Sequence, residues 1–61
     1  MTQKQIKNTI ELCKGNDISS IRQLLSYYRP SDLKDMAKEL GVTGDDHDLK
    51  DRLAFALANH A

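Results

Sequence analysis

Residues 31–57 read SDLKDMAKELGVTGDDHDLKDRLAFAL, and this stretch decides the fold. Its first half carries apolar residues at helical spacing, and Ser31 precedes them as a predicted N-cap. Gly41 follows the last of them and predicts the end of the helix, with a valine next to it for the hydrophobic contact of a glycine cap. A short acidic connector follows, in which Asp45 or Asp46 is expected to cap another helix. The stretch therefore predicts a helix, a connector and a second helix.

Two more helices are predicted before this stretch. The first covers residues 1–14, because Thr2 and Gln5 form a capping-box pattern at its start and Gly15 supplies a left-handed residue after its end. The second covers roughly residues 19–29, since the proline that follows disfavours helical geometry in the residue before it.

Each of the four helices has one apolar stripe, and no segment shows the alternation of a strand. Short connections between four such helices predict an all-α protein, a compact bundle of four short helices forming one domain over residues 1–61. The stripe residues expected in the core are Ile6, Thr9, Ile10, Cys13, Ile18, Ile21, Leu24, Leu25, Tyr28, Leu33, Met36, Ala37, Leu40, Leu49, Leu53, Ala56 and Leu57.

The length and composition narrow the class of protein further. A chain of 61 residues buries a modest core, which we expect to supply no more than about 3–5 kcal/mol. Its single cysteine excludes an internal disulfide. Neither a membrane-length apolar run nor the apolar region of a signal peptide is present, so we expect a cytoplasmic protein without a membrane partner.

The charges balance overall but differ between the two halves. Residues 1–30 contain five cations and two anions, a net charge of 5 − 2 = +3, whereas residues 31–61 contain four and seven, 4 − 7 = −3. The halves could attract each other within one bundle, the basic half could meet an acidic partner, or two copies could pair half against half.

Two aromatic residues lie off the stripes of their helices. Tyr27 is rotated away from the apolar face of its helix, and Phe55 projects roughly opposite Leu53. Either the other helices bury both rings within one bundle, or the rings lie at an interface between chains, where aromatic residues are enriched. The residues predicted for such a protein interface are Tyr27, Phe55, Leu12 and Leu57.

The C-terminal half resembles the SAP and related helix-extension-helix modules. The matching residues are Leu33, Leu40, Gly41, Val42, Gly44, Leu49, Arg52 and Leu53. The resemblance implies DNA binding near the start of the last helix. The acidic run after Gly44 departs from that family, because carboxylates repel phosphates. Nucleic-acid binding is therefore the alternative function, through Lys4, Lys7, Lys14, Arg22, Arg29, Lys50 and Arg52.

Catalytic and metal sites have little support in the sequence. Cys13 shares a stripe with two isoleucines, which favours a buried thiol over a nucleophile. The acidic run does not have the spacing of a calcium loop, and the two histidines lack further ligands for zinc. We expect no enzyme activity, no metal and no cofactor. The residues considered for a metal are Asp45, Asp46, His47, Asp48 and His60.

These observations favour a small regulatory or accessory protein that binds a protein partner, or itself as a homodimer. The size of the chain would also suit a phage accessory protein. The nucleic-acid alternative differs from this expectation in one measurable respect, because phosphate binding weakens steeply with salt.

Overall fold

The computed structural model describes residues 1–60, except for the side chain of Asp46. Within that range it contains four helices and no strand. They are α1 (Gln3–Cys13), α2 (Ile18–Leu25), α3 (Pro30–Leu40) and α4 (Asp46–Ala58). The predicted all-α fold is thus confirmed. No helix in this part of the chain combines the length and the apolar composition needed to cross a membrane.

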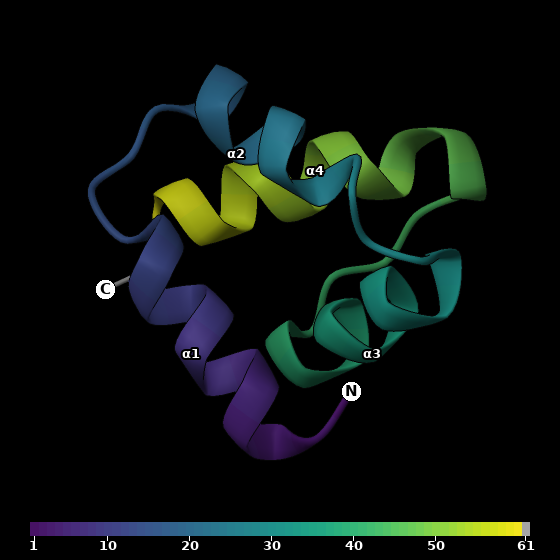
Figure 1. Cartoon of the computed structure of the whole chain (residues 1–61). Coiled ribbons are helices and arrows are strands. Elements are labelled where there is room, and N and C mark those ends of the chain that lie inside the picture. The colour runs from purple at the N-terminus through teal and green to yellow at the C-terminus, as the bar shows by residue number, and fades with distance from the viewer. Residues whose placement is uncertain (61) are drawn as a thin grey trace.

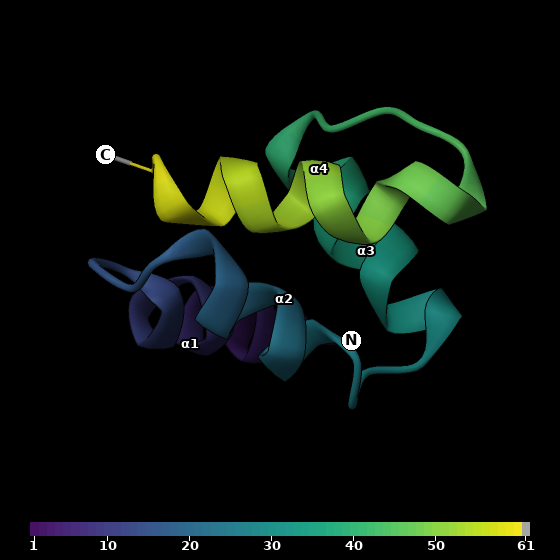
Figure 2. The same ribbon diagram turned by 90° about the horizontal axis from the view of Figure 1, so that it is seen from above.

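Helix α4 is the axis of the fold, because each of the other helices packs against it. Figure 1 shows α2 lying along α4 with the opposite chain direction, and in this view α1 and α3 lie below both of them. The view from above in Figure 2 shows α4 stacked over α1 and α2. The fully or almost fully buried side chains form one core, made by Ile6, Cys13, Ile21, Leu25, Met36, Ala37, Leu49, Leu53, Ala54 and Leu57.

Helix α1 begins and ends as its sequence predicts, within two residues. The Gln5 backbone N–H donates to the Thr2 hydroxyl, and the Gln5 side chain accepts from the Thr2 N–H, so the capping box is complete. After the helix, Gly15 has a φ of 82°, the left-handed conformation expected of it.

Helix α3 ends in a Schellman motif. Gly41 has a φ of 71°, and its N–H donates to the Lys38 carbonyl. The Val42 N–H donates to the Ala37 carbonyl at 2.8 Å, and the Val42 side chain packs against the core. The connector then leads to Asp45, the N-cap of α4, whose backbone is extended. The expected helix, connector and helix are therefore present.

Two predicted helix boundaries were wrong. Helix α3 starts at Pro30 rather than after Ser31, because proline at the first helical position has the required φ and lacks only an N–H that would be unpaired there. Helix α2 ends at Leu25 instead of residue 29. The N–H groups of Tyr27 and Tyr28 each donate to the carbonyl three residues earlier, so the helix closes in tighter turns.

Two predicted core positions, Ile18 and Ala56, lie outside the core, and Ala54 belongs to it although it was not predicted. Ile18 is 39% exposed at the start of α2. Ala56 is half-buried, whereas its neighbour Ala54 is fully buried although it lies off the leucine stripe. Because helices pack on several sides of α4, its buried face is wider than one stripe.

Candidate interaction surfaces

The outward face of α4 presents the exposed ring of Phe55. Successive residues of a helix are about 100° apart, so Phe55 points about 200° away from Leu53. Leu53 is fully buried and Phe55 is 60% exposed, as this rotation requires. The predicted position of Phe55 opposite the core is thereby confirmed, and the three helices packed on α4 do not enclose its ring.

A shallow depression lies beside Phe55. It is formed where the connector after α3 meets the second half of α4, and Val42, Arg52 and Ala56 are among its lining residues. The Arg52 side chain lies over Gly44, so closely that a Cβ added to this glycine would come within 2.7 Å of the arginine Cδ. Phe55 therefore borders a recess of mixed polarity, and we call this ring and recess the Phe55 surface.

Tyr27 is the most exposed of the large hydrophobic residues, at 81%. It does not form one patch with Phe55. Arg22 of α2 and Asp51 of α4 are joined by an ion pair, which marks where the two antiparallel helices lie level with each other. Tyr27 follows Arg22 toward the N-terminal end of α4, whereas Phe55 follows Asp51 toward its C-terminal end. The two rings are thus displaced in opposite directions along the molecule.

The two leucines predicted for the interface have different positions. Leu12 is 62% exposed near the end of α1. Leu57 is fully buried in the core, so its predicted place at a protein interface was wrong. It lies one turn after Leu53 on the inner face of α4, and a partner could reach it only by opening the fold.

The cations predicted for nucleic acid are divided among several neighbourhoods. The Arg22 Nε lies 2.6 Å from a carboxylate oxygen of Asp51, so its charge is already paired. Lys4 and Lys7 border a depression of α1 that also contains Glu39. The other predicted cations do not join them: Arg52 borders the Phe55 surface, Lys50 lies near the first turns of α4, and Lys14 and Arg29 are exposed at helix ends.

Two lysines absent from the predicted set occupy a more concentrated position. Lys34 and Lys38 are one turn apart on α3 and border the connector that leads to α4. Lys34 and Lys50 also share a second depression, between the end of α2 and the start of α4. The four-residue spacing on α3 was a usable signal in the sequence, but the approach of Lys50 depends on how α3 and α4 pack.

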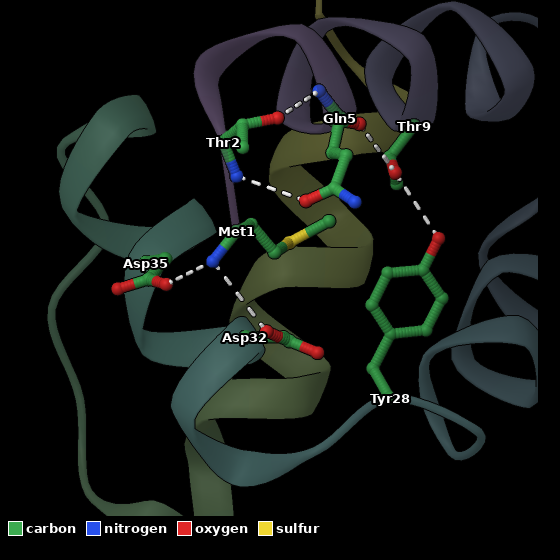
Figure 3. A network of polar contacts seen from close by, with 7 residues as sticks. All are labelled: Met1, Thr2, Gln5, Thr9, Tyr28, Asp32 and Asp35. Atoms are coloured by element: carbon green, nitrogen blue, oxygen red, sulfur yellow. Dashed lines mark hydrogen bonds and ion pairs between the residues drawn. The ribbon is translucent and has the colours of Figure 1, made fainter.

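A polar network joins α1 to α3, and no pattern in the sequence predicted it (Figure 3). The Met1 ammonium lies 2.6 Å from a carboxylate oxygen of Asp35 and 3.6 Å from one of Asp32. The hydrogen bond to Asp35 and the charge of both carboxylates raise the pKa of this ammonium. Nearby, the hydroxyls of Thr9 and Tyr28 are 3.1 Å apart and form a hydrogen bond.

Cys13 is fully buried beside the leucines of α4. Burial raises the pKa of its thiol, because the thiolate would lose its hydration. The thiol is therefore protonated and weakly nucleophilic at neutral pH.

The acidic run considered for a metal includes the side chain of Asp46, which lies outside the described residues.

The described residues thus include an exposed ring beside a recess, the Phe55 surface, and two depressions bordered by Lys34, Lys38 and Lys50. No family model, no curated protein and no solved structure matches the chain, so the likeness of residues 31–57 to SAP modules stays a resemblance of sequence pattern.

Proposed function

We propose that the chain is a small non-enzymatic protein-interaction module that self-associates through the Phe55 surface. The observation that carries the proposal is the 60% exposure of Phe55 directly opposite a fully buried leucine of the same helix. An exposed ring of this size beside a recess is typical of the centre of an interface.

Burial of the Phe55 ring would contribute to the free energy of association. Fully burying a phenylalanine side chain is worth about 1.5–3 kcal/mol, and more than half of this ring is still accessible. A stable interface takes about 800 Å² from each partner. The accessible surface of the chain is 4364 Å², so a dimer of this size would cover about a fifth of each copy.

The Phe55 surface suits a two-fold pairing. In a symmetric dimer each residue meets a residue of the same patch, so the patch must be complementary to itself. This patch has a protruding ring and a recess next to each other, and it carries both Asp51 and Arg52. A two-fold axis between them would place each ring in the recess of the other copy.

Sedimentation equilibrium over a wide range of protein concentration tests the proposal. We expect a monomer–dimer equilibrium that the Phe55→Asp substitution shifts to the monomer, because a carboxylate would be buried without a partner. Tyr27→Asp is the matched control: it makes the same kind of change at an exposed ring away from the Phe55 surface, and it should leave the equilibrium unchanged. A chain that stays monomeric at every concentration, or a dimer that tolerates Phe55→Asp, would exclude this function.

Nucleic-acid binding, the alternative expected from the sequence, has less support. Of its seven predicted cations, Arg22 is paired and the others lie in several neighbourhoods, so few of them could reach one stretch of phosphates together. A single basic surface is the feature on which such binding depends.

A further inference from the structure

The glycines of the chain are required for two different reasons. Gly15 and Gly41 have positive φ values, and a Cβ built on either would meet no atom within 4 Å beyond its neighbours in the chain. Their requirement is therefore one of backbone conformation. Gly44 does not have a positive φ. A Cβ built on it would instead lie 2.7 Å from the Cδ atom of Arg52 and 3.1 Å from its Nε atom. Position 44 thus needs a glycine because the Arg52 side chain occupies the space above it.

This contact places the Arg52 side chain along the connector between α3 and α4. The Arg52 Cζ atom, the centre of the guanidinium, would also lie 3.9 Å from the Cβ built on Gly44, so the stem and the head group lie over one backbone position. An exposed arginine loses conformational freedom when a partner binds it. Contact with the connector restricts the side chain beforehand, which reduces that loss.

Arg52 also borders the recess of the Phe55 surface, together with Val42 and Ala56. It precedes Phe55 by three residues on α4, so the two side chains are neighbours on the outer face of the helix. In a two-fold dimer the ring of one copy enters the recess of the other and meets the Arg52 of that copy, and symmetry makes this contact twice. The head group of arginine is planar and stacks on aromatic faces, where its charge is attracted by the ring.

We propose that Arg52 selects the partner in self-association: its guanidinium stacks on the Phe55 ring of the second copy, and Gly44 positions it by leaving room for its side chain. The proposal rests on self-association through the Phe55 surface and names what that surface recognises, an aromatic ring rather than any apolar side chain. An interface made by the apolar part of the recess alone would accept a leucine in place of Phe55 equally well.

Sedimentation equilibrium of the wild type, Arg52→Ala, Gly44→Ala and the double variant tests the roles of both residues. Arg52→Ala should raise the dissociation constant of the dimer at least about fivefold, because two stacked contacts are lost in each dimer. Gly44→Ala should raise it at least about threefold, since the added methyl group displaces the Arg52 side chain from the ring. In the Arg52→Ala background the same glycine substitution should have no effect, because no side chain is left to displace.

Two controls separate this effect from a loss of charge or of the fold. Arg29→Ala removes an exposed arginine that does not line the recess, and it should leave the dissociation constant unchanged. Urea unfolding of the monomeric variants measures whether each keeps its stability. Gly44→Ala requires only the outer part of a flexible side chain to move, so we expect this variant to fold normally.

A ring-current measurement by nuclear magnetic resonance tests the stacking itself. Protons over the face of an aromatic ring resonate upfield, so the Arg52 Hε signal should move upfield as the protein concentration is raised and dimers form. Phe55→Tyr should keep both association and this shift, because tyrosine offers the same ring face. Phe55→Leu should weaken association at least about fivefold and abolish the shift, because it keeps an apolar side chain without a ring.

Three results would overturn the proposal although self-association stood. They are an unchanged dissociation constant of Arg52→Ala, a Gly44→Ala effect that persists in the Arg52→Ala background, and equal association of the Phe55→Leu chain. A wild-type chain that stays monomeric at every concentration would instead remove self-association itself. The two failures are therefore distinguishable.

Discussion

The inner and outer faces of α4 differ although they belong to one short helix. Leu53 and Ala54 are fully buried, and the very next residue, Phe55, is 60% exposed. The inner face is in contact with three other helices, whereas the outer face is bordered by the connector after α3 and by the ion pair between Asp51 and Arg22. Hydrophobicity alone therefore does not place a side chain of this helix; its angle around the axis does.

The difference separates what holds the fold together from what is available for binding. The inner face uses its leucines to bury area within the chain, so a change there should be measured as lost stability. The outer face carries a ring that contributes little to the core, so a change there should be measured as altered association. A substitution that affected both quantities equally would show that the two faces are not independent.

The largest expected effect comes from truncating the inner face. Leu53→Ala should destabilise the fold by about 2–5 kcal/mol, because it removes buried methyl groups and leaves a cavity. With a total stability of about 3–5 kcal/mol, this variant should be largely unfolded. Phe55→Ala, the matched change on the outer face, should alter the stability of the monomer by less than about 0.5 kcal/mol.

Urea unfolding followed by circular dichroism checks this pair of variants, at a protein concentration low enough to keep the chain monomeric. If Phe55→Ala were as destabilising as Leu53→Ala under these conditions, the ring would have to be part of the core of the single chain. The separation between the two faces would then be wrong.

A smaller effect is expected at the border between the faces, where Asp51 pairs with Arg22. The side chains are 56% and 55% exposed, so solvent screens the ion pair strongly. A double-mutant cycle with Asp51→Ala and Arg22→Ala should give a coupling energy of about 0–1 kcal/mol that decreases as salt is added. A larger, salt-independent coupling would mean that this border is dehydrated.

The smallest effect is the pH dependence of stability. It comes from the polar link between α1 and α3, whereas the apolar contacts of α4 do not titrate. Contact with Asp35, and then with Asp32, raises the folded-state pKa of the Met1 ammonium above the unfolded value of about 8. The stabilisation is therefore complete below about pH 8 and is lost as the pH rises through the folded-state pKa.

Comparing the free and the Nα-acetylated chain isolates this contribution. Acetylation removes the charge but leaves the Cys13 thiol, whose raised pKa also affects stability at high pH, in both samples. The free chain should be the more stable one at neutral pH, and the difference should vanish in alkaline solution. A difference that persists there would have to come from a cause other than the ammonium charge.

The predictions from sequence were most successful where the signal is local. The capping box joins Thr2 to Gln5 within the first turn of α1. Each left-handed glycine, after α1 and after α3, is recognised from its own place in the sequence. The signal at Pro30 is also local, but its interpretation was wrong. The proline was taken as the end of one helix, whereas it is the first residue of the next.

The predictions failed where several helices act together. Leu57 was assigned to an interface because of its proximity to Phe55 in the sequence, but it is buried because helices pack on several sides of α4. The burial of Ala54, off the leucine stripe, has the same cause. Lys50 of α4 and Lys34 of α3 border one depression, and their separation in the sequence did not indicate that they lie close together.

The sequence by itself determined that this chain forms four helices, where the glycine caps lie, and that Phe55 points away from the leucines of its own helix. These properties depend on backbone conformation and on the period of the helix, which neighbouring residues set. The tertiary structure decided which apolar side chains stay exposed and which cations lie together, because exposure and charge proximity depend on the helices that pack alongside. The Phe55 surface is therefore a product of the way α4 meets the connector that follows α3.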